Sequence, residues 1–190
     1  MRASKLRILG MCAALAVGTG IALAANAPQA VLPGGPDASI AKEVRHEIVM
    51  YTHYTIFDDI SFRVDQGSVE LDGAVTQPYK KSDLTKIVQQ IPGVTSVTNN
   101  LKVLPLSPMD DRLRMQIARA IYRDPSISTL GYQALPPIHI IVDNGHVTLE
   151  GVVNTDLQKQ VAGIRAGTTG LSFGPVVNNL RVENPSPKKG

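Results

Sequence analysis

The chain has little cysteine and few aromatic residues. Its 190 residues include one cysteine, no tryptophan, five tyrosines and three phenylalanines. Because that cysteine is Cys12, the rest of the chain has no disulfide, no thiol nucleophile and no cysteine metal ligand. The fold must therefore be held together by side-chain packing.

Residues 1–27 have the layout of a secretory signal peptide. Three basic residues stand among the first seven, and the stretch 8–25 that follows carries no charge. Small residues allow cleavage after Ala24 or after Ala27. An uncleaved anchor is the alternative, since the uncharged run is nearly long enough to span a bilayer. Its glycines and the small residues at its end favour cleavage, which predicts a periplasmic protein.

Cys12 does not have the context of a lipidated cysteine. Met11 stands directly before it, where a small residue is needed, and almost no hydrophobic run precedes the pair. We therefore expect no lipid anchor at this position.

The net charge depends on the leader. The whole chain has 19 basic and 16 acidic residues, and residues 1–27 contain three of the basic ones and none of the acidic ones. The exported chain therefore has 16 of each and no net charge. The excess of basic residues therefore gives no argument for nucleic-acid binding, and we expect no nucleic-acid partner. Residues 28–107 carry a net charge of −2 and residues 108–190 carry +2.

Part of the chain is present twice. Residues 60–75 recur as residues 138–153, with an offset of 78, and eight of the sixteen positions are identical. Residues 97–103 are echoed in the same way by residues 176–182. A period this long indicates two tandem domains, because solenoid repeats are shorter and more numerous.

Each copy is predicted to have the order αββαβ. In the first copy, Asp37 can cap a helix that buries Ile40, Val44 and Ile48, and strands follow at 60–65 and 68–75. A second helix with Pro78 in its first turn buries Leu84, Ile87, Val88 and Ile91, and a strand follows at 94–103. Three strands are too few for a barrel, which predicts an α+β fold with two helices on one face of a three-stranded sheet.

The second copy repeats this plan. Its helices are expected at 109–122 and 155–166, and the second of these is expected to bury Leu157, Val161 and Ile164. Its strands are expected at 138–143, 146–153 and 176–182. The expected layout is a signal peptide at 1–27, a linker at 28–37, a domain at 38–104, a linker at 105–108, a domain at 109–183 and a disordered tail at 184–190.

The repeated pattern resembles the BON domain, named for bacterial osmotic-stress and nodulation proteins. Both copies contain Val-Asp-x-Gly-x-Val-x-Leu-x-Gly-x-Val, then a helix, then Asn-Asn-Leu-x-Val. The resemblance implies a non-enzymatic periplasmic protein that binds phospholipid and supports the cell envelope or osmotic-stress tolerance. The alternative is a protein-interaction or chaperone-like module whose partners are envelope proteins.

The positions that define the repeat are expected to be structural. We interpret its glycines as turn and close-packing positions, and its asparagines as residues that bond local backbone groups. These positions are Gly67, Gly73, Gly145, Gly151, Asn99, Asn100, Asn178 and Asn179.

No catalytic or metal-binding constellation stands out in the sequence. The four histidines lack the i, i+4 spacing of a helical metal site, and we expect them to face solvent. No serine has a nucleophile context, and the carboxylates are scattered. We therefore predict no cofactor, no metal and no enzymatic activity. The histidines are His46, His53, His139 and His146.

The candidate binding residues lie on the helix 109–122. Arg112, Arg119 and Arg123 project within about 40° of one another, opposite an apolar face. They can form a solvated surface, contact anionic phospholipid head groups or bind an acidic protein. Tyr122 is added as a fourth candidate for lipid contact. The apolar residues of the following connection, 126–137, are either core or an exposed wedge beside the arginines.

Overall fold

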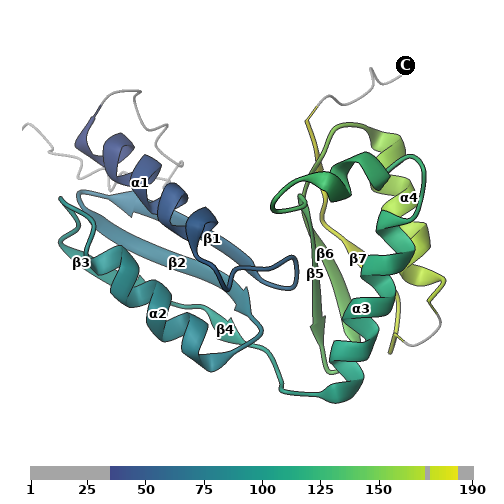
Figure 1. The fold of residues 1–190 in the computed structure, drawn as a ribbon. Helices are drawn as coiled ribbons and strands as arrows, with labels where there is room; N and C mark the ends of the chain where they lie inside the picture. Colours follow the sequence, from purple (N-terminus) through teal and green to yellow (C-terminus); the bar gives the residue numbers. More distant parts are fainter. Residues whose placement is uncertain (1–34, 170–171, 184–190) are drawn as a thin grey trace, which may run out of the picture. The chain divides into compact units, whose positions relative to one another are not determined.

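The computed structural model describes residues 35–169 and 172–183, so the predicted signal peptide and tail lie outside the described residues. Two repeats follow one another, each with a helix, a hairpin, a second helix and a final strand in two pieces (Figure 1). The predicted α+β class and αββαβ order are confirmed. The first repeat contains α1 (Pro36–Met50), β1 (Asp59–Asp65), β2 (Ser68–Val75), α2 (Pro78–Gln89), β3 (Ser96–Asn99) and β4 (Lys102–Val103). The second contains α3 (Pro108–Tyr122), the short 3-10 helix η1 (Ser128–Tyr132), β5 (Ile138–Asp143), β6 (His146–Val153), α4 (Asp156–Gly167), β7 (Val177–Asn178) and β8 (Arg181–Val182).

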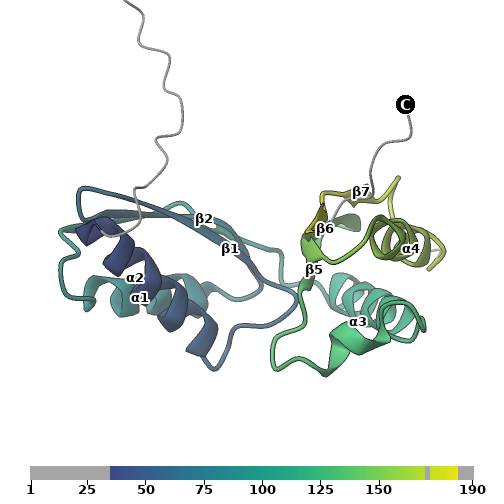
Figure 2. The same ribbon diagram turned by 90° about the horizontal axis from the view of Figure 1, so that it is seen from above.

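The second strand of each hairpin is the centre of its sheet. β2 is antiparallel to β1 and parallel to β3 and β4, and β6 has the same relation to β5, β7 and β8. The register places Phe62 opposite Leu71 and Ile140 opposite Leu149, so the apolar residues of each hairpin share one face. Figure 2 shows α1 and α2 together on one side of the first sheet.

The final strand of each repeat is interrupted, whereas the sequence predicted it as continuous. The Leu101 N–H donates to the Asn99 side-chain oxygen at 3.0 Å, and the Leu180 N–H donates to that of Asn178 at 3.3 Å. These local bonds take the place of strand pairing between the two pieces of each final strand. The two leucine side chains there point into the core, where both are buried.

The core of the first repeat lies between the two helices and the hairpin. Ile40, Val44 and Ile48 of α1 are buried in it, as predicted, and so are Leu84 and Val88 of α2. Complete burial of one such side chain stabilises the fold by about 1.5 to 3 kcal/mol. The predicted apolar faces of α1 and α2 are confirmed, with Ile91 also buried and Ile87 half-buried.

The predicted buried face of α4 is wrong for Leu157 and Ile164, whereas Val161 is half-buried against the core. Leu157 is 61% exposed and Ile164 is 63% exposed, whereas Ala162 and Ala166 are completely buried. The alanines allow α4 to lie close to the rest of the repeat, and the two larger side chains therefore face outward. Spacing alone could not choose between the two stripes, because both recur at helical intervals.

An aspartate near the start of the first helix fixes the hairpin of each repeat. The Asp37 carboxylate accepts the N–H groups of Gln66 and Gly67, both at 2.9 Å. Asp110 accepts those of Asn144 and Gly145, also at 2.9 Å. The prediction that Asp37 caps α1 is wrong, since the N-cap is Gly35 and the carboxylate is used by the hairpin turn.

The connection between α1 and β1 contacts strand β5 of the second repeat. The Ile140 N–H donates to the Ile56 carbonyl at 2.7 Å, and the His139 Nδ1–H donates to the Asp58 carbonyl at 2.6 Å. The Tyr54 ring stacks on the His139 imidazole, with centroids 5.6 Å apart. The expectation that all four histidines face solvent is therefore wrong for His139, which is buried by these contacts.

The apolar side chains of the connection after α3, predicted to be either core or an exposed wedge, include both buried and exposed ones. Ile127 and Leu130 are buried in the core of the second repeat, whereas Tyr132 is 87% exposed. η1 lies on this connection and turns one apolar side inward. Two of its apolar side chains are therefore core and Leu135 is half-buried, whereas residues 131–134 are exposed.

Candidate functional site

Helix α3 is held firmly by the residues on its inner side. The Ser107 hydroxyl accepts the Asp110 N–H at 3.2 Å, which caps the first turn. The guanidinium of Arg114 is buried and donates to the Asp111 carboxylate and to the Val142 carbonyl, each at 2.5 Å. These contacts fix the rotation of α3 and thereby decide which of its side chains face solvent.

Three arginines face solvent on the outer side of α3, and we call Arg112, Arg119 and Arg123 the arginine face. All three side chains are exposed, and none of them forms an ion pair within the part of the chain that the structure describes. Met109 and Met115 on the same helix are also exposed. These arginines therefore face solvent and lie on the same helix as exposed apolar side chains.

The acidic residues near the arginine face are committed to other partners. Asp110 bonds the hairpin turn, and Asp111 pairs with the buried Arg114. Asp124 pairs with Arg165 of α4 at 2.8 Å. The positive charge of the arginine face is therefore not neutralised by direct contact.

Tyr122 points inward, unlike the arginines. Its hydroxyl donates to the Ile138 carbonyl at 3.0 Å and accepts the Ile138 N–H at 3.2 Å. Burial raises the pKa of this phenol, although the bond to Ile138 acts in the opposite direction. The polar end of Tyr122 is thus used at the edge of β5 and is not free for a head group.

The glycines of the repeat lie at turns and close approaches. Gly67 and Gly145 follow the hairpin residues Gln66 and Asn144, and all four have positive φ. A Cβ at Gly73 would lie 2.2 Å from the Asp59 carbonyl oxygen, and one at Gly151 would lie 2.0 Å from that of Pro137. Only glycine allows the two hairpin strands to approach this closely.

The asparagines of the repeat bond neighbouring elements. Asn99 and Asn178 donate to helix carbonyls, those of Lys81 at 2.9 Å and Lys159 at 2.8 Å. Asn100 donates to Glu70 at 2.8 Å, and Asn179 donates to Glu150 at 2.7 Å. Each pair therefore ties the final strand of its repeat to the second helix and to the central strand.

A buried ion pair in the first repeat was not predicted from the sequence. Lys80 of α2 donates to the Asp58 carboxylate at 2.7 Å and to the Thr76 hydroxyl at 2.8 Å, and both charged residues are buried. Asp58 also accepts bonds from Thr55 and from the Thr76 N–H. Burial raises the pKa of Asp58, but the bonds from Lys80, Thr76 and Thr55 outweigh it and lower the pKa below its ordinary value. No local motif could reveal this pair, because its members are 22 residues apart.

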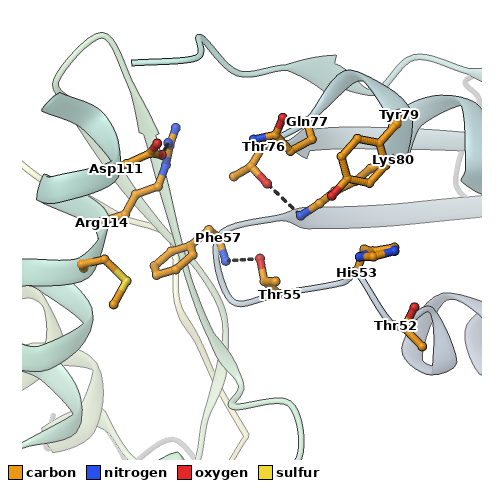
Figure 3. Close-up of a pocket in the computed structure, with 11 residues that line it drawn as sticks. Thr52, His53, Thr55, Phe57, Thr76, Gln77, Tyr79, Lys80, Asp111 and Arg114 are labelled. Carbon is orange, nitrogen blue, oxygen red and sulfur yellow. Dashed lines mark hydrogen bonds and ion pairs between the residues drawn. The ribbon is translucent and has the colours of Figure 1, made fainter. Parts of the chain in front are cut away.

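An open pocket of about 380 Å³ lies beside this ion pair (Figure 3). Figure 3 shows Asp111 and Arg114 on one side of it and His53, Tyr79 and Lys80 on the other. Lys80 and Arg114 are both paired, as described above. His53 makes edge contacts with the rings of Tyr51 and Tyr79, and no hydrogen bond joins it to a hydroxyl within the described chain. His53 is therefore not placed as the base of a hydroxyl nucleophile in this pocket.

Two other kinds of site are absent from residues 35–169 and 172–183. These residues contain no group of three or more histidine, cysteine or acidic side chains placed to hold a metal ion. They also contain no helix with the length and apolar character needed to cross a bilayer.

Both repeats match one protein-family model. The model of the BON domain matches residues 36–105 and again residues 109–184. The chain belongs to the BON domain family. The resemblance read from the repeated hairpin and the Asn-Asn-Leu pattern is confirmed, and the two repeats are BON domains.

Comparison with characterised proteins adds little to this assignment. No curated protein matches the chain. Among solved structures it is similar to CdsD, described as a structural protein of the type III secretion system of Chlamydia trachomatis, with 16% identity and a TM-score of 0.30 over 76% of this chain and 61% of that one. A structure of the C-terminal domain of CdsD matches with 14% identity and a TM-score of 0.26 over 74% of this chain and 96% of that one. This chain thus spans 61% of the first CdsD structure, and likenesses this weak carry no functional argument.

Proposed function

We propose that this BON protein is a non-enzymatic periplasmic protein that binds anionic phospholipid surfaces through the arginine face of α3. Through this contact it supports the integrity of the cell envelope, including under osmotic stress. Family membership supports a non-catalytic envelope module. The observation that carries the lipid assignment is a set of three exposed arginines, on a helix whose rotation is fixed, that form no ion pair with any other described residue.

The size of the effect follows from the charge. An arginine near an anionic membrane surface contributes about 1 kcal/mol, so three contribute about 3 kcal/mol, or about a hundredfold in affinity. Binding of this strength is reversible and falls as salt screens the charges. Exposed Met109 and Met115 can enter the interfacial region once the arginines have brought the helix to the surface. Tyr122 is left out of the proposed contact, because its hydroxyl is bonded to Ile138.

Vesicle sedimentation tests this proposal. The purified exported protein is mixed with phosphatidylglycerol vesicles or with phosphatidylcholine vesicles, at low and at moderate salt. We expect retention on the anionic vesicles only, with a loss at moderate salt. Equal retention on both lipids that does not respond to salt would contradict the proposal and favour a protein partner.

A pair of matched variants separates this surface from a general effect of charge. The arginine-face variant loses three exposed cations from α3, and the control variant loses three exposed cations from the first repeat. We expect about a hundredfold weaker binding in the first case and less than a tenfold change in the second. The variants are Arg112→Gln, Arg119→Gln, Arg123→Gln, and Lys42→Gln, Arg45→Gln, Lys86→Gln.

A further inference from the structure

The outer edge of β5 is closed by side chains and by a neighbouring loop. The backbone groups of Ile138 bond the Tyr122 hydroxyl, the Ile140 N–H bonds the Ile56 carbonyl, and the Val142 carbonyl bonds Arg114. These three residues of β5 lie opposite Gly151, Leu149 and Val147 of β6. Along an antiparallel ladder the backbone groups of alternate residues point toward the partner strand and away from it, and these three point away. The second repeat therefore exposes little unpaired backbone at this edge.

The corresponding edge of β1 has no such cover. The offset of 78 between the hairpins makes Ile60, Phe62 and Val64 the counterparts of the three outward residues of β5. Within residues 35–169 and 172–183, β1 pairs with β2 alone, and no side chain bonds the backbone of these three residues. Arg45 lies 5.8 Å from the centre of the Phe62 ring, so it covers the ring and not the backbone.

The difference comes from two positions on the first helix of each repeat. Asp37 and Asp110 bond equivalent hairpin turns, which aligns α1 with α3. In this alignment the counterpart of Tyr122 is Val49, which is 53% exposed, and the counterpart of Arg114 is Ala41. Neither side chain can bond a backbone group. The edge of β1 is thus an unpaired strand edge beside an exposed apolar side chain, which is a template for strand addition.

We propose that two copies of this chain associate through β1, with the two strands antiparallel across a two-fold axis. An added strand must place apolar residues on the helix-covered face and polar residues on the open face. β1 itself meets this requirement, because Ile60, Phe62 and Val64 contact the core while Ser61 and Arg63 are exposed. A two-fold pairing would therefore extend the sheet of one copy into that of the other.

Charge opposes this pairing only weakly. Residues 28–107 carry a net charge of −2 in each copy, and salt screens a repulsion of this size. The exposed side of α1 presents both signs of charge in its middle and the apolar Val49 and Met50 at its end. This proposal does not depend on lipid binding, since it uses the first repeat and a different helix.

Sedimentation equilibrium combined with hydrogen exchange tests the proposal on the exported protein. We expect a monomer–dimer equilibrium, with amide exchange at Phe62 and Val64 slowing as the protein concentration rises. The Ile140 amide, which is already bonded, serves as the internal reference and should not change with concentration. A protein that remains monomeric, or a dimer in which exchange at Phe62 is independent of concentration, would overturn the proposal.

A charged substitution beside the edge provides the matched variant. Val49→Lys adds a cation beside the edge of β1 at an exposed position, and we expect it to weaken the dimer by about tenfold or more. Leu157→Lys makes the same change at an exposed apolar position of α4 and should leave the dimer constant unchanged. Equal effects of the two variants would contradict an interface at β1.

Discussion

The two BON domains share a backbone plan but use charge differently. In the first, exposed charges of both signs alternate along α1, and a buried ion pair joins Asp58 to Lys80. In the second, the exposed charges in the middle and at the end of α3 are arginines. In the second domain, the offset of 78 places the neutral residues Pro136 and Gln158 at the positions of Asp58 and Lys80.

This difference shows which features belong to the fold and which distinguish the copies. The aspartate that bonds the hairpin turn and the close approach at the hairpin glycine are present in both domains. Surface charge and the cover of the sheet edge are not shared. The shared features stabilise each domain. The two domains can therefore bind different partners through the features that differ, which are surface charge and the exposed sheet edge.

The largest expected effect is loss of the buried ion pair. Asp58→Ala leaves the Lys80 ammonium buried without its partner, which should lower the free energy of unfolding by about 4 kcal/mol. Gln158→Ala, at the counterpart of Lys80, removes neutral bonds to Asn154 and Ser126 and should cost about 1 kcal/mol. Urea unfolding of both variants measures the difference. Equal costs would contradict the contrast between the domains.

The same ion pair predicts how stability depends on pH. The pKa of Asp58 is lower in the folded protein than its ordinary value of 3.8, so its contribution is complete above that value. The contribution is lost as the pH falls from 3.8 through the folded pKa, because the carboxyl then takes up a proton. Acid unfolding followed by circular dichroism should show this loss, and the Asp58→Asn variant should show a smaller one.

A smaller effect is expected at the aspartates that bond the hairpin turns. Asp110 is buried, so Asp110→Ala leaves two N–H groups without a partner or water and should cost about 3 kcal/mol. Asp37 is half-buried, and water can replace its carboxylate, so Asp37→Ala should cost about 1.5 kcal/mol. Thermal unfolding of the two variants checks the order. A larger loss for Asp37→Ala would mean that burial does not set the cost.

The smallest expected difference is the one between the two glycines that end the hairpin turns. A Cβ at Gly67 would lie 2.7 Å from the Gly93 carbonyl oxygen, whereas one at Gly145 would meet the exposed ring of Phe173. Backbone cannot move aside but an exposed ring can, so Gly67→Ala should cost about 2 kcal/mol and Gly145→Ala about 1 kcal/mol. Denaturant midpoints measured side by side test this order, and the reverse order would contradict it.

The sequence predicted most of the fold because its signals are local and duplicated. The helical spacing of Leu84 and Val88 predicts α2, and the alternation of Ile60, Phe62 and Val64 predicts β1. The second copy of the pattern predicts the corresponding elements independently. The buried stripe of α4 was predicted wrongly, because alanines can pack more closely than Leu157 and Ile164.

The candidate site was only partly accessible from sequence. Helical spacing placed Arg112, Arg119 and Arg123 on one side of α3, and the structure shows them exposed. The inward bond of Tyr122 and the buried position of His139 depend on contacts with distant segments. Such contacts join residues that no local pattern relates.

The central claim is that the second domain, and not the first, meets the membrane. Nuclear magnetic resonance with a spin-labelled anionic lipid in bicelles tests it residue by residue. The account predicts that the label broadens the amide signals of α3, most strongly around Arg112 and Arg119, and leaves those of α1 unchanged. Equal broadening of the two helices, or broadening of α1 alone, would contradict it.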